Sequence, residues 1–212
     1  VLVCCDFDGT ITLQDTGVIL IDKCIGTETR KALDEKAMIG ESKLRDIFKQ
    51  MWDGVNLTWE EALVLLKDVE LDPKFEIFAE YCFSNSIPFH VFSGGLEFMI
   101  EYFLRKFFPN DYTNFKIRAN YGVLEGRKWI CTFKDESEFG HDKGLSMDIA
   151  EEEYKREHGE VKPFIIFCGD GVSDLSAARR ADVLFARRGR GLEKYCMEHG
   201  IKYVPFDDFQ IV

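Results

Sequence analysis

The chain has 212 residues, more than the ~150 of a typical domain and fewer than two such domains would need. Hydrophobic residues make up 46% and charged residues 31%, a composition that supports a packed core and is unlike that of disordered chains. The formal net charge is −11, from 27 Lys and Arg against 38 Asp and Glu, which disfavours nucleic acid or an anionic membrane as partner. We therefore expect one core domain with an insertion.

The seven cysteines include no CxxC pair and no Cys/His cluster, so neither a disulfide framework nor a zinc site is indicated. This pattern is typical of small buried thiols in a reducing compartment. No apolar stretch reaches the ~18 residues of a membrane span, and the first residues do not resemble a secretory leader. We expect a soluble intracellular protein in the cytoplasm, with the nucleus as the alternative. The sequence does not indicate an oligomeric state.

Four short apolar runs end in polar or glycine-rich residues, as buried strands do where they break into loops. They cover residues 2–5, 88–92, 164–168 and 183–186. Helix-like stretches follow the last three runs, at 96–107, 173–180 and 192–199, and a further helix is expected at 143–157. Strands that alternate with helices in this way predict an α/β fold with a Rossmann-like, doubly wound parallel sheet covered on both faces.

The segment between the first and second strands has a helical pattern instead. A 3.6-residue stripe is formed by Leu44, Ile47, Phe48 and Met51. Thr58 and Glu61 have capping-box spacing, and Asp72-Pro73 is a good helix start. We therefore predict a core domain at 1–13 and 85–212, with a small helical cap domain at 14–84. Residues 121–133 predict a small β-hairpin.

Polar residues at the ends of the predicted strands should meet, because ligands bind beyond the carboxyl ends of strands in an open parallel sheet. These residues are Asp6, Asp8, Ser93, Asp170 and Asp174. Gathered carboxylates repel each other and need a cation, and hard oxygen ligands favour Mg²⁺, which also bridges to phosphate oxygens. Ser93-Gly94-Gly95 at a helix start forms an anion cradle, and Lys143 adds a point charge. The pattern predicts a magnesium and phosphate site.

These residues, in this order, resemble the four motifs of the haloacid dehalogenase superfamily of phosphohydrolases. The motifs are Asp-Phe-Asp-Gly-Thr-Ile-Thr at 6–12, Ser93 in Val-Phe-Ser-Gly-Gly, Lys143 in Gly-His-Asp-Lys-Gly, and Gly-Asp-Gly-Val-Ser-Asp at 169–174. All four are intact, and the strand pattern between them extends the resemblance over nearly the whole chain. It implies a Mg²⁺-dependent phosphomonoesterase that works through an aspartyl-phosphate intermediate.

The resemblance also implies a role for each motif residue. Asp6 is expected to be the nucleophile, and Asp8 the general acid that then becomes the general base. Mg²⁺ is expected to be held by the carboxylates of Asp6 and Asp170 and by the backbone carbonyl of Asp8. Asp174 is expected to be a further ligand or an orienting group. The phosphoryl oxygens are expected to contact Ser93, the Gly94 amide and Lys143.

The insertion lies where one branch of this superfamily, similar to the phosphoserine phosphatases, carries a helical cap. A lid there favours a small soluble phosphomonoester over a phosphoprotein, although an insertion that only adds packing mass remains an alternative. In that branch, the glutamate that meets the substrate amine falls at Asp15 here, the cap methionine at Met38, and the carboxylate-binding arginine near Met51. An apolar residue in place of the guanidinium disfavours phosphoserine and favours an uncharged or apolar tail. Met51 also completes the helical stripe, so a purely structural role stays open.

Several other functions are compatible with parts of the pattern. One is a catalytically weak phosphate-binding or sensing module, which the intact Asp6/Asp8 pair disfavours; another is a phosphatase that acts on a protein. A receiver domain has no place for the insertion, and the dehalogenase branch lacks the second aspartate. Arg187, Arg188 and Arg190 follow the last strand at the ligand edge of the sheet and are expected in solvent, with contact to an anionic substrate as the alternative. His141 is expected to make structural hydrogen bonds.

Overall fold

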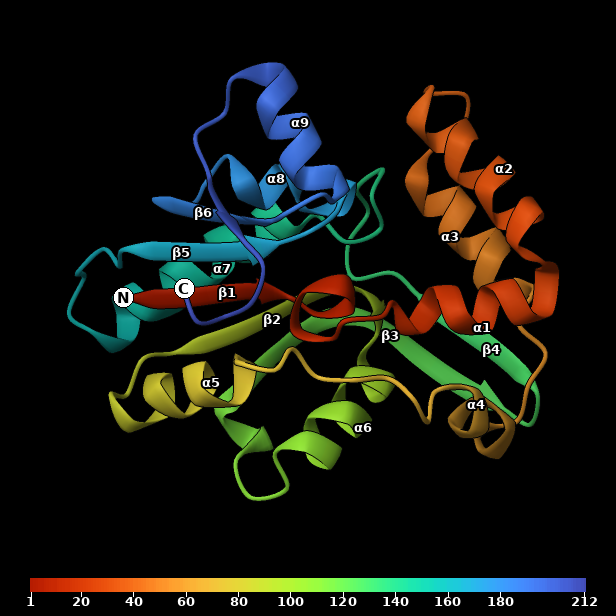
Figure 1. The fold of residues 1–212 in the computed structure, drawn as a ribbon, viewed down its shortest axis with the longest axis horizontal. Helices are drawn as coiled ribbons and strands as arrows, with labels where there is room; N and C mark the ends of the chain where they lie inside the picture. Colours follow the sequence, from red (N-terminus) through yellow and green to blue (C-terminus); the bar gives the residue numbers. More distant parts are fainter.

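The computed structural model describes residues 1–212, except for the side chain of Met38 (Figure 1). Over these residues the strands form a seven-stranded sheet in the order β4-β3-β2-β1-β5-β6-β7. The strands are β1 (Leu2–Asp6), β2 (Phe89–Leu96), β3 (Phe115–Glu125), β4 (Lys128–Thr132), β5 (Ile165–Gly169), β6 (Val183–Arg187) and β7 (Val204–Phe206). Neighbours pair in parallel, except that β3 and β4 form an antiparallel hairpin. The predicted fold class and hairpin are confirmed; β7 and the first half of β3 were not predicted.

Helices cover both faces of the sheet. One face carries α5 (Phe75–Ser84) and α6 (Glu97–Phe107), and the other carries α7 (Lys143–Glu157), α8 (Leu175–Ala178) and α9 (Gly191–His199). Cys4 and Cys5 illustrate the strand alternation, because Cys4 packs in the core on the α7 face and Cys5 in the core on the α5 face. The sheet is therefore doubly wound.

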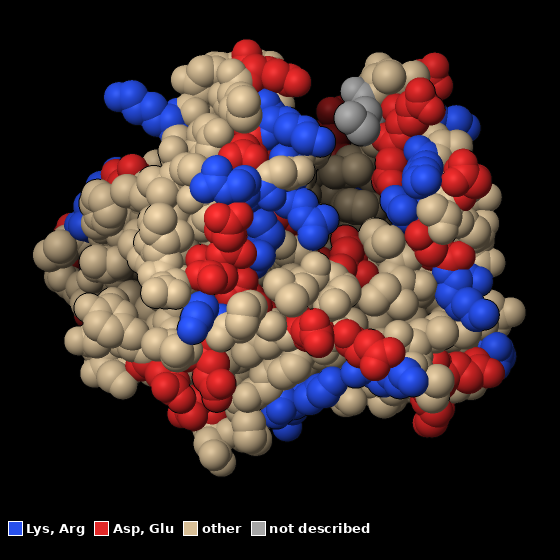
Figure 2. Space-filling model, in the orientation of Figure 1, with Lys and Arg blue, Asp and Glu red and all other residues tan. Residues whose placement is uncertain are grey.

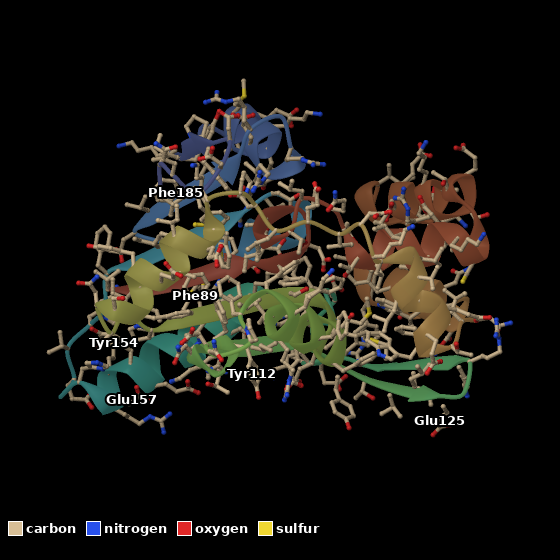
Figure 3. The ribbon with its side chains drawn as sticks, turned by 60° about the horizontal axis from the view of Figure 1, so that its bottom comes forward. Phe89, Tyr112, Glu125, Tyr154, Glu157 and Phe185 are labelled. Atoms are coloured by element: carbon tan, nitrogen blue, oxygen red, sulfur yellow. The ribbon has the colours of Figure 1, made fainter. Side chains whose placement is uncertain are left out.

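Four helices in the predicted insertion lie together at one side of the sheet (Figure 1). They are α1 (Thr16–Ile25), α2 (Thr27–Met38), α3 (Leu44–Asp53) and α4 (Trp59–Leu65). The predicted stripe on α3 buries Ile47 and Met51, and the predicted capping box of Thr58 and Glu61 begins α4. The last helix of the segment, α5, packs on the sheet instead. The ring of Phe75 lies 5.7 Å from that of Phe89, which Figure 3 labels on β2 beside this helix.

The β3–β4 hairpin packs against α3 and α4. Trp129 of β4 stacks on Trp52 of α3 with ring centroids 5.8 Å apart, and its indole N–H donates to the Leu57 carbonyl at 2.9 Å. Glu125, at the end of β3, lies far from the rest of the sheet in Figure 3. The insertion is therefore held by the sheet's own extension as well as by its two connectors.

The two connectors between the sheet and α1–α4 are paired. Thr12 and Leu71 form an antiparallel bridge, and the Asp72 amide donates to the Ile11 carbonyl at 2.9 Å. The guanidinium of Arg187 donates to the Thr10 carbonyl at 2.8 Å and to Asp72 Oδ2 at 2.6 Å. The prediction for Arg187 was wrong: this side chain is buried because it neutralises the buried carboxylate of Asp72, whereas Arg188 and Arg190 are exposed.

A membrane span would need a longer and more apolar helix than any in the described chain.

Candidate active site

A cleft of about 260 Å³ lies between the carboxyl edge of the sheet and helices α1–α3, visible as the hollow in Figure 2. Its floor includes the predicted site residues Asp6, Asp8, Ser93, Gly94 and Asp170, and its wall includes Asp15 and Met51. Lys143 and Asp174 lie behind the floor and are buried. The structure thus brings together residues that are far apart in the sequence. Met38, the remaining candidate, lies outside the described side chains.

Three carboxylates, two in the floor and one behind it, face one another. Asp6, Asp170 and Asp174 each place an oxygen within 4.8 Å of the others. Lys143 Nζ lies 2.7 Å from Asp6 Oδ1 and 2.6 Å from Asp174 Oδ1. Burial and the charge of Asp174 raise the pKa of Asp6, and the same two causes raise the pKa of Asp170 to about 6. Burial alone would lower the pKa of Lys143, but Asp174 and Asp6 raise it.

This cluster fits a divalent cation. One ammonium neutralises only part of the charge of three carboxylates, and the donors are hard oxygens, the ligands that Mg²⁺ prefers. Asp174 is held in place because its Oδ2 accepts from the amides of Asp170 at 3.0 Å and Gly171 at 2.9 Å. The remaining carboxylate oxygens therefore meet in a fixed arrangement.

Asp8 is held at the boundary between the floor and the insertion. Its Oδ1 accepts from the Thr16 amide at 2.8 Å and the Thr16 hydroxyl at 2.7 Å, and its Oδ2 lies 3.4 Å from Ser93 Oγ. Burial and the charge of Asp15 raise the pKa of Asp8 to about 7. A carboxyl group with such a pKa can both give and take a proton near neutral pH. The sequence offered no sign of the contact from Thr16, the first residue of α1.

The last residues of β2, which include Ser93 and Gly94, are fixed by His141, which lies before α7, and by Asn120 of β3. His141 Nδ1 lies 2.7 Å from the Ser93 carbonyl, and its Nε2 lies 2.8 Å from Ser146 Oγ. Asn120 of β3 donates to the Gly94 carbonyl at 2.8 Å. The structural role predicted for His141 is confirmed, whereas Asn120 was missed because its strand was missed.

The loop after β1 needs glycine at position 9. Gly9 has φ +76°, and a Cβ there would lie 2.5 Å from Asp170 Oδ2, well inside van der Waals contact. The motif glycine thus allows the loop to approach the carboxylate cluster. Thr10 follows it, with its hydroxyl 3.5 Å from Asp170 Oδ1.

The wall contributed by α1–α3 contains residues that the sequence analysis did not select. Arg30 and Asp34 of α2 and Phe48 of α3 line the cleft beside Met51 and Trp52. Helix α2 is charged along most of its length, so no periodic pattern marks the residues that face the cleft. Asp15 caps α1, with its Oδ1 accepting from the Val18 amide at 2.8 Å.

Comparison with known proteins agrees with this geometry. Residues 3–179 match the family model of haloacid dehalogenase-like hydrolases. The chain is 38% identical to Pdp3-interacting factor 1 of Schizosaccharomyces pombe, over 96% of this chain and 89% of that protein. It is 34% identical to a polyol phosphate phosphatase of Saccharomyces cerevisiae, over 97% and 88%. A 2-hydroxy-3-keto-5-methylthiopentenyl-1-phosphate phosphatase of Bacillus cereus is 27% identical, over 98% and 92%.

Two solved structures share the fold. A hydrolase of the same family from Salmonella enterica serovar Typhi superposes with a TM-score of 0.77 at 14% identity, covering 99% of this chain and 68% of that one. A phosphoserine phosphatase in complex with its substrate gives 0.67 at 16% identity, covering 93% and 97%. At such identities the likeness concerns the fold alone.

Proposed function

Because the chain belongs to the haloacid dehalogenase-like hydrolases, we propose that it is a Mg²⁺-dependent phosphomonoesterase that hydrolyses a small phosphorylated metabolite through an aspartyl-phosphate on Asp6. The main observation that supports this proposal is that Asp6, Asp8, Asp170 and Lys143 lie close together at the floor of one cleft. The match to the family model and the curated relatives confirm the resemblance drawn from the four motifs at the level of the family.

The proposed reaction has two displacements. Asp6 Oδ1 is held by the Phe7 amide at 2.7 Å and by Lys143, so we assign the attack on phosphorus to Oδ2. The bond between phosphorus and the alcohol oxygen breaks, and Asp8 gives its proton to the leaving alkoxide. Asp8 then takes a proton from water, whose oxygen attacks phosphorus and releases Asp6 and inorganic phosphate.

The other residues position the phosphoryl group. Ser93 Oγ, the Gly94 amide and Lys143 would donate to its oxygens. Asp6, Asp170 and Asp174 would hold Mg²⁺, together with the Asp8 carbonyl, and the ion would supply positive charge for the phosphoryl oxygens. We propose helices α1–α4 as the cap over the cleft. The packing of α5 on Phe89 supports a cap that ends before this helix, shorter than the predicted 14–84.

The substrate proposed is a small phosphomonoester with an uncharged tail. Met51 in the wall supports this tail, and so do the two related phosphatases, whose names give a polyol phosphate and a hydroxy-keto thioether phosphate as substrates. The free thiols of the described chain support the cytoplasmic location that we propose.

The Asp6→Asn variant tests this function. An amide cannot form the acyl-phosphate, so the variant should release phosphate from an aryl phosphate at least about 1,000-fold more slowly than the wild type, a loss typical of removed nucleophiles. Phosphate release would be measured with Mg²⁺ and again with excess EDTA, which should also abolish turnover. The matched control is Asp207→Asn, an exposed carboxylate beside Arg188. Wild-type turnover by Asp6→Asn would refute the nucleophile, and an inactive wild type would favour a phosphate-binding module.

A further inference from the structure

A group of charged residues at the start of α1 and on α1 and α2, called the polar ridge below, lies across the cleft from the catalytic floor. It consists of Asp15, Asp22, Arg30 and Asp34. The guanidinium of Arg30 lies between two carboxylates, with Nη1 2.7 Å from Asp34 Oδ2 and Nε donating to Asp22 Oδ1. Arg30 and Asp34 line the cleft, and Asp15 is near enough for both charges to influence its ionisation. The Arg30 side chain is only 16% exposed, so the protein holds it in this position.

The ridge carries an excess of negative charge. Asp15, Asp22 and Asp34 bring three carboxylates against the one guanidinium of Arg30. The described residues that line the whole cleft include five aspartates and one arginine. A second anionic group on the substrate would face this excess at short range and lose water as it entered. The ridge therefore disfavours tails that carry a carboxylate or a second phosphate.

The ridge also presents donors and acceptors side by side. Arg30 has N–H groups that only donate, while Asp34 has carboxylate oxygens that only accept. A hydroxyl group both donates and accepts, so a tail with successive hydroxyls can bind both residues. The excess negative charge attracts an ammonium group, which could donate to Asp34 but has no acceptor for the N–H groups of Arg30. The hydrogen-bonding pattern therefore suits hydroxyls, which use both residues, better than an amine, which uses one.

An apolar surface completes the wall. Phe48, Met51 and Trp52 of α3 line the same cleft, and a Cβ placed on Gly94 would lie 3.6 Å from the Phe48 ring. Phe48 thus adjoins the end of β2, which is proposed to bind phosphate. A flexible carbon chain could lie along this surface with its hydroxyls turned toward Arg30 and Asp34.

We propose that Arg30 and Asp34 are specificity-determining residues that bind the hydroxyl groups of an open-chain polyol monophosphate and reject anionic tails. This inference rests on the proposed function and assigns its substrate class to named side chains. The resemblance to the phosphoserine phosphatases pointed to position 51 on α3, whereas the arginine that lines the cleft is Arg30 on α2, which is paired with Asp22 and Asp34.

The test compares specificity constants on four substrates: an alditol monophosphate, phosphoserine, phosphoethanolamine and an aryl phosphate that has no hydroxylated tail. With Mg²⁺, the wild type should show a kcat/KM for the alditol phosphate at least about 10-fold above those for phosphoserine and phosphoethanolamine. Asp34→Asn and Arg30→Gln should each lower the ratio of alditol to aryl kcat/KM by about 10-fold, because each replaces a charged hydrogen-bonding partner of the hydroxyls with a neutral, weaker one. The loss should lie mainly in KM, because the tail does not take part in the chemical step.

The matched control is Lys31→Gln on the same helix, where the exposed side chain pairs only loosely with Glu28 at 3.4 Å. Its ratio should equal that of the wild type. Thermal unfolding of each variant would show whether it folds. The Asp34 side chain is 40% exposed, so Asp34→Asn should fold and can test the proposal even if Arg30→Gln does not fold.

Each outcome decides a different question. An unchanged ratio in Asp34→Asn, or a wild type that prefers phosphoserine or phosphoethanolamine, overturns the specificity assignment and leaves the phosphatase intact. A wild type that fails even on the aryl phosphate overturns the proposed function, and the inference with it.

Discussion

Two buried histidines, His90 and His141, lie in environments that oppose their charged form. Burial lowers the pKa of His90 to about 3 and that of His141 to about 4, and neighbouring cations act in the same direction. Both are therefore neutral in the folded protein, whereas in the unfolded chain they bind a proton below a pH of about 6.5. The unfolded state binds more protons below that pH, so this contribution to the free energy of unfolding falls as the pH falls from about 6.5 toward 4.

The His90→Asn variant isolates the contribution of His90. Its carbonyl oxygen can replace Nδ1 as acceptor for Arg118 Nε, which lies 3.2 Å from that nitrogen. Between pH 7 and pH 5, the wild type should lose about 1–2 kcal/mol more of its free energy of unfolding than the variant does. Urea unfolding at several pH values measures this difference. The carboxylates with raised pKa values act with the opposite sign, but equally in both proteins, so parallel curves would contradict the prediction.

Residues that follow predicted strands could be placed from the sequence, because strand ends meet at one edge whatever the details of packing. Asp6, Asp8, Ser93 and Asp170 were found in this way. Arg187 and Arg30 could not be, because the neutralising partners Asp72 and Asp22 come from other segments, and a lone arginine in a sequence favours solvent.

At the scale of elements, the connectors of the insertion depend on one ion pair. The carboxylate of Asp72 is fully buried, and its Oδ1 accepts from the Lys74 amide at 3.0 Å while Arg187 binds Oδ2. Arg187 also donates to the Asp207 carbonyl at 3.0 Å, so it joins the loop after β1, the segment before α5 and the residues after β7. Loss of the guanidinium would leave a buried charge with no counterion.

The Arg187→Met variant should therefore lose about 3–5 kcal/mol of its free energy of unfolding. The double variant Arg187→Met with Asp72→Asn should recover much of that loss, since asparagine keeps an acceptor for the Lys74 amide but carries no charge. Chemical denaturation of both single variants and the double variant gives the coupling energy. Additive losses would mean that the two side chains contribute independently, contrary to this account.

Elements that pack through a regular pattern were predictable, and those defined by their neighbours were not. The stripe of α3 and the capping box of α4 are local, and both were found. Helix α2 is polar and has only a weak apolar stripe. It is held in place by its contacts with α1 and α3. Strand β7 has three residues and depends on β6 for its hydrogen bonds, so nothing local distinguishes it from a loop.

For the molecule as a whole, the net charge is −11, and negative charge is concentrated at the carboxylate cluster of the cleft. Acidic and basic side chains are interspersed on the face shown in Figure 2. In contrast, Asp6, Asp170 and Asp174 meet at one place, where Lys143 is the one basic side chain among the described residues that forms ion pairs within the cluster. Net charge therefore argued against nucleic acid but contained no information about an anionic ligand. Three carboxylates and one ammonium leave a local charge of −2, which a bound divalent cation would cancel.

Magnesium should accordingly stabilise the folded protein. At about 100 times the dissociation constant, binding adds about 2.7 kcal/mol to the free energy of unfolding, which raises the thermal midpoint by roughly 5–10 °C for a chain of this size. A thermal scan with Mg²⁺, against NaCl at equal ionic strength, measures the shift. Asp170→Asn should reduce it strongly, while an equal shift in that variant would mean that Mg²⁺ acts elsewhere.

The bridge between Thr12 and Leu71 means that the chain leaves the sheet and returns to it at adjacent points. The segment between Thr12 and Leu71 is therefore a single loop whose two ends meet at this bridge. The entropy cost of bringing the ends of a loop together grows only slowly with the length of the loop. Exchange of that loop for one of another length would leave the pairing of β1 with β2 and β5 unchanged. The proposed recognition of the tail and the proposed chemistry at phosphorus thus occupy different stretches of one polypeptide, which remain linked where Thr16 of α1 donates to Asp8.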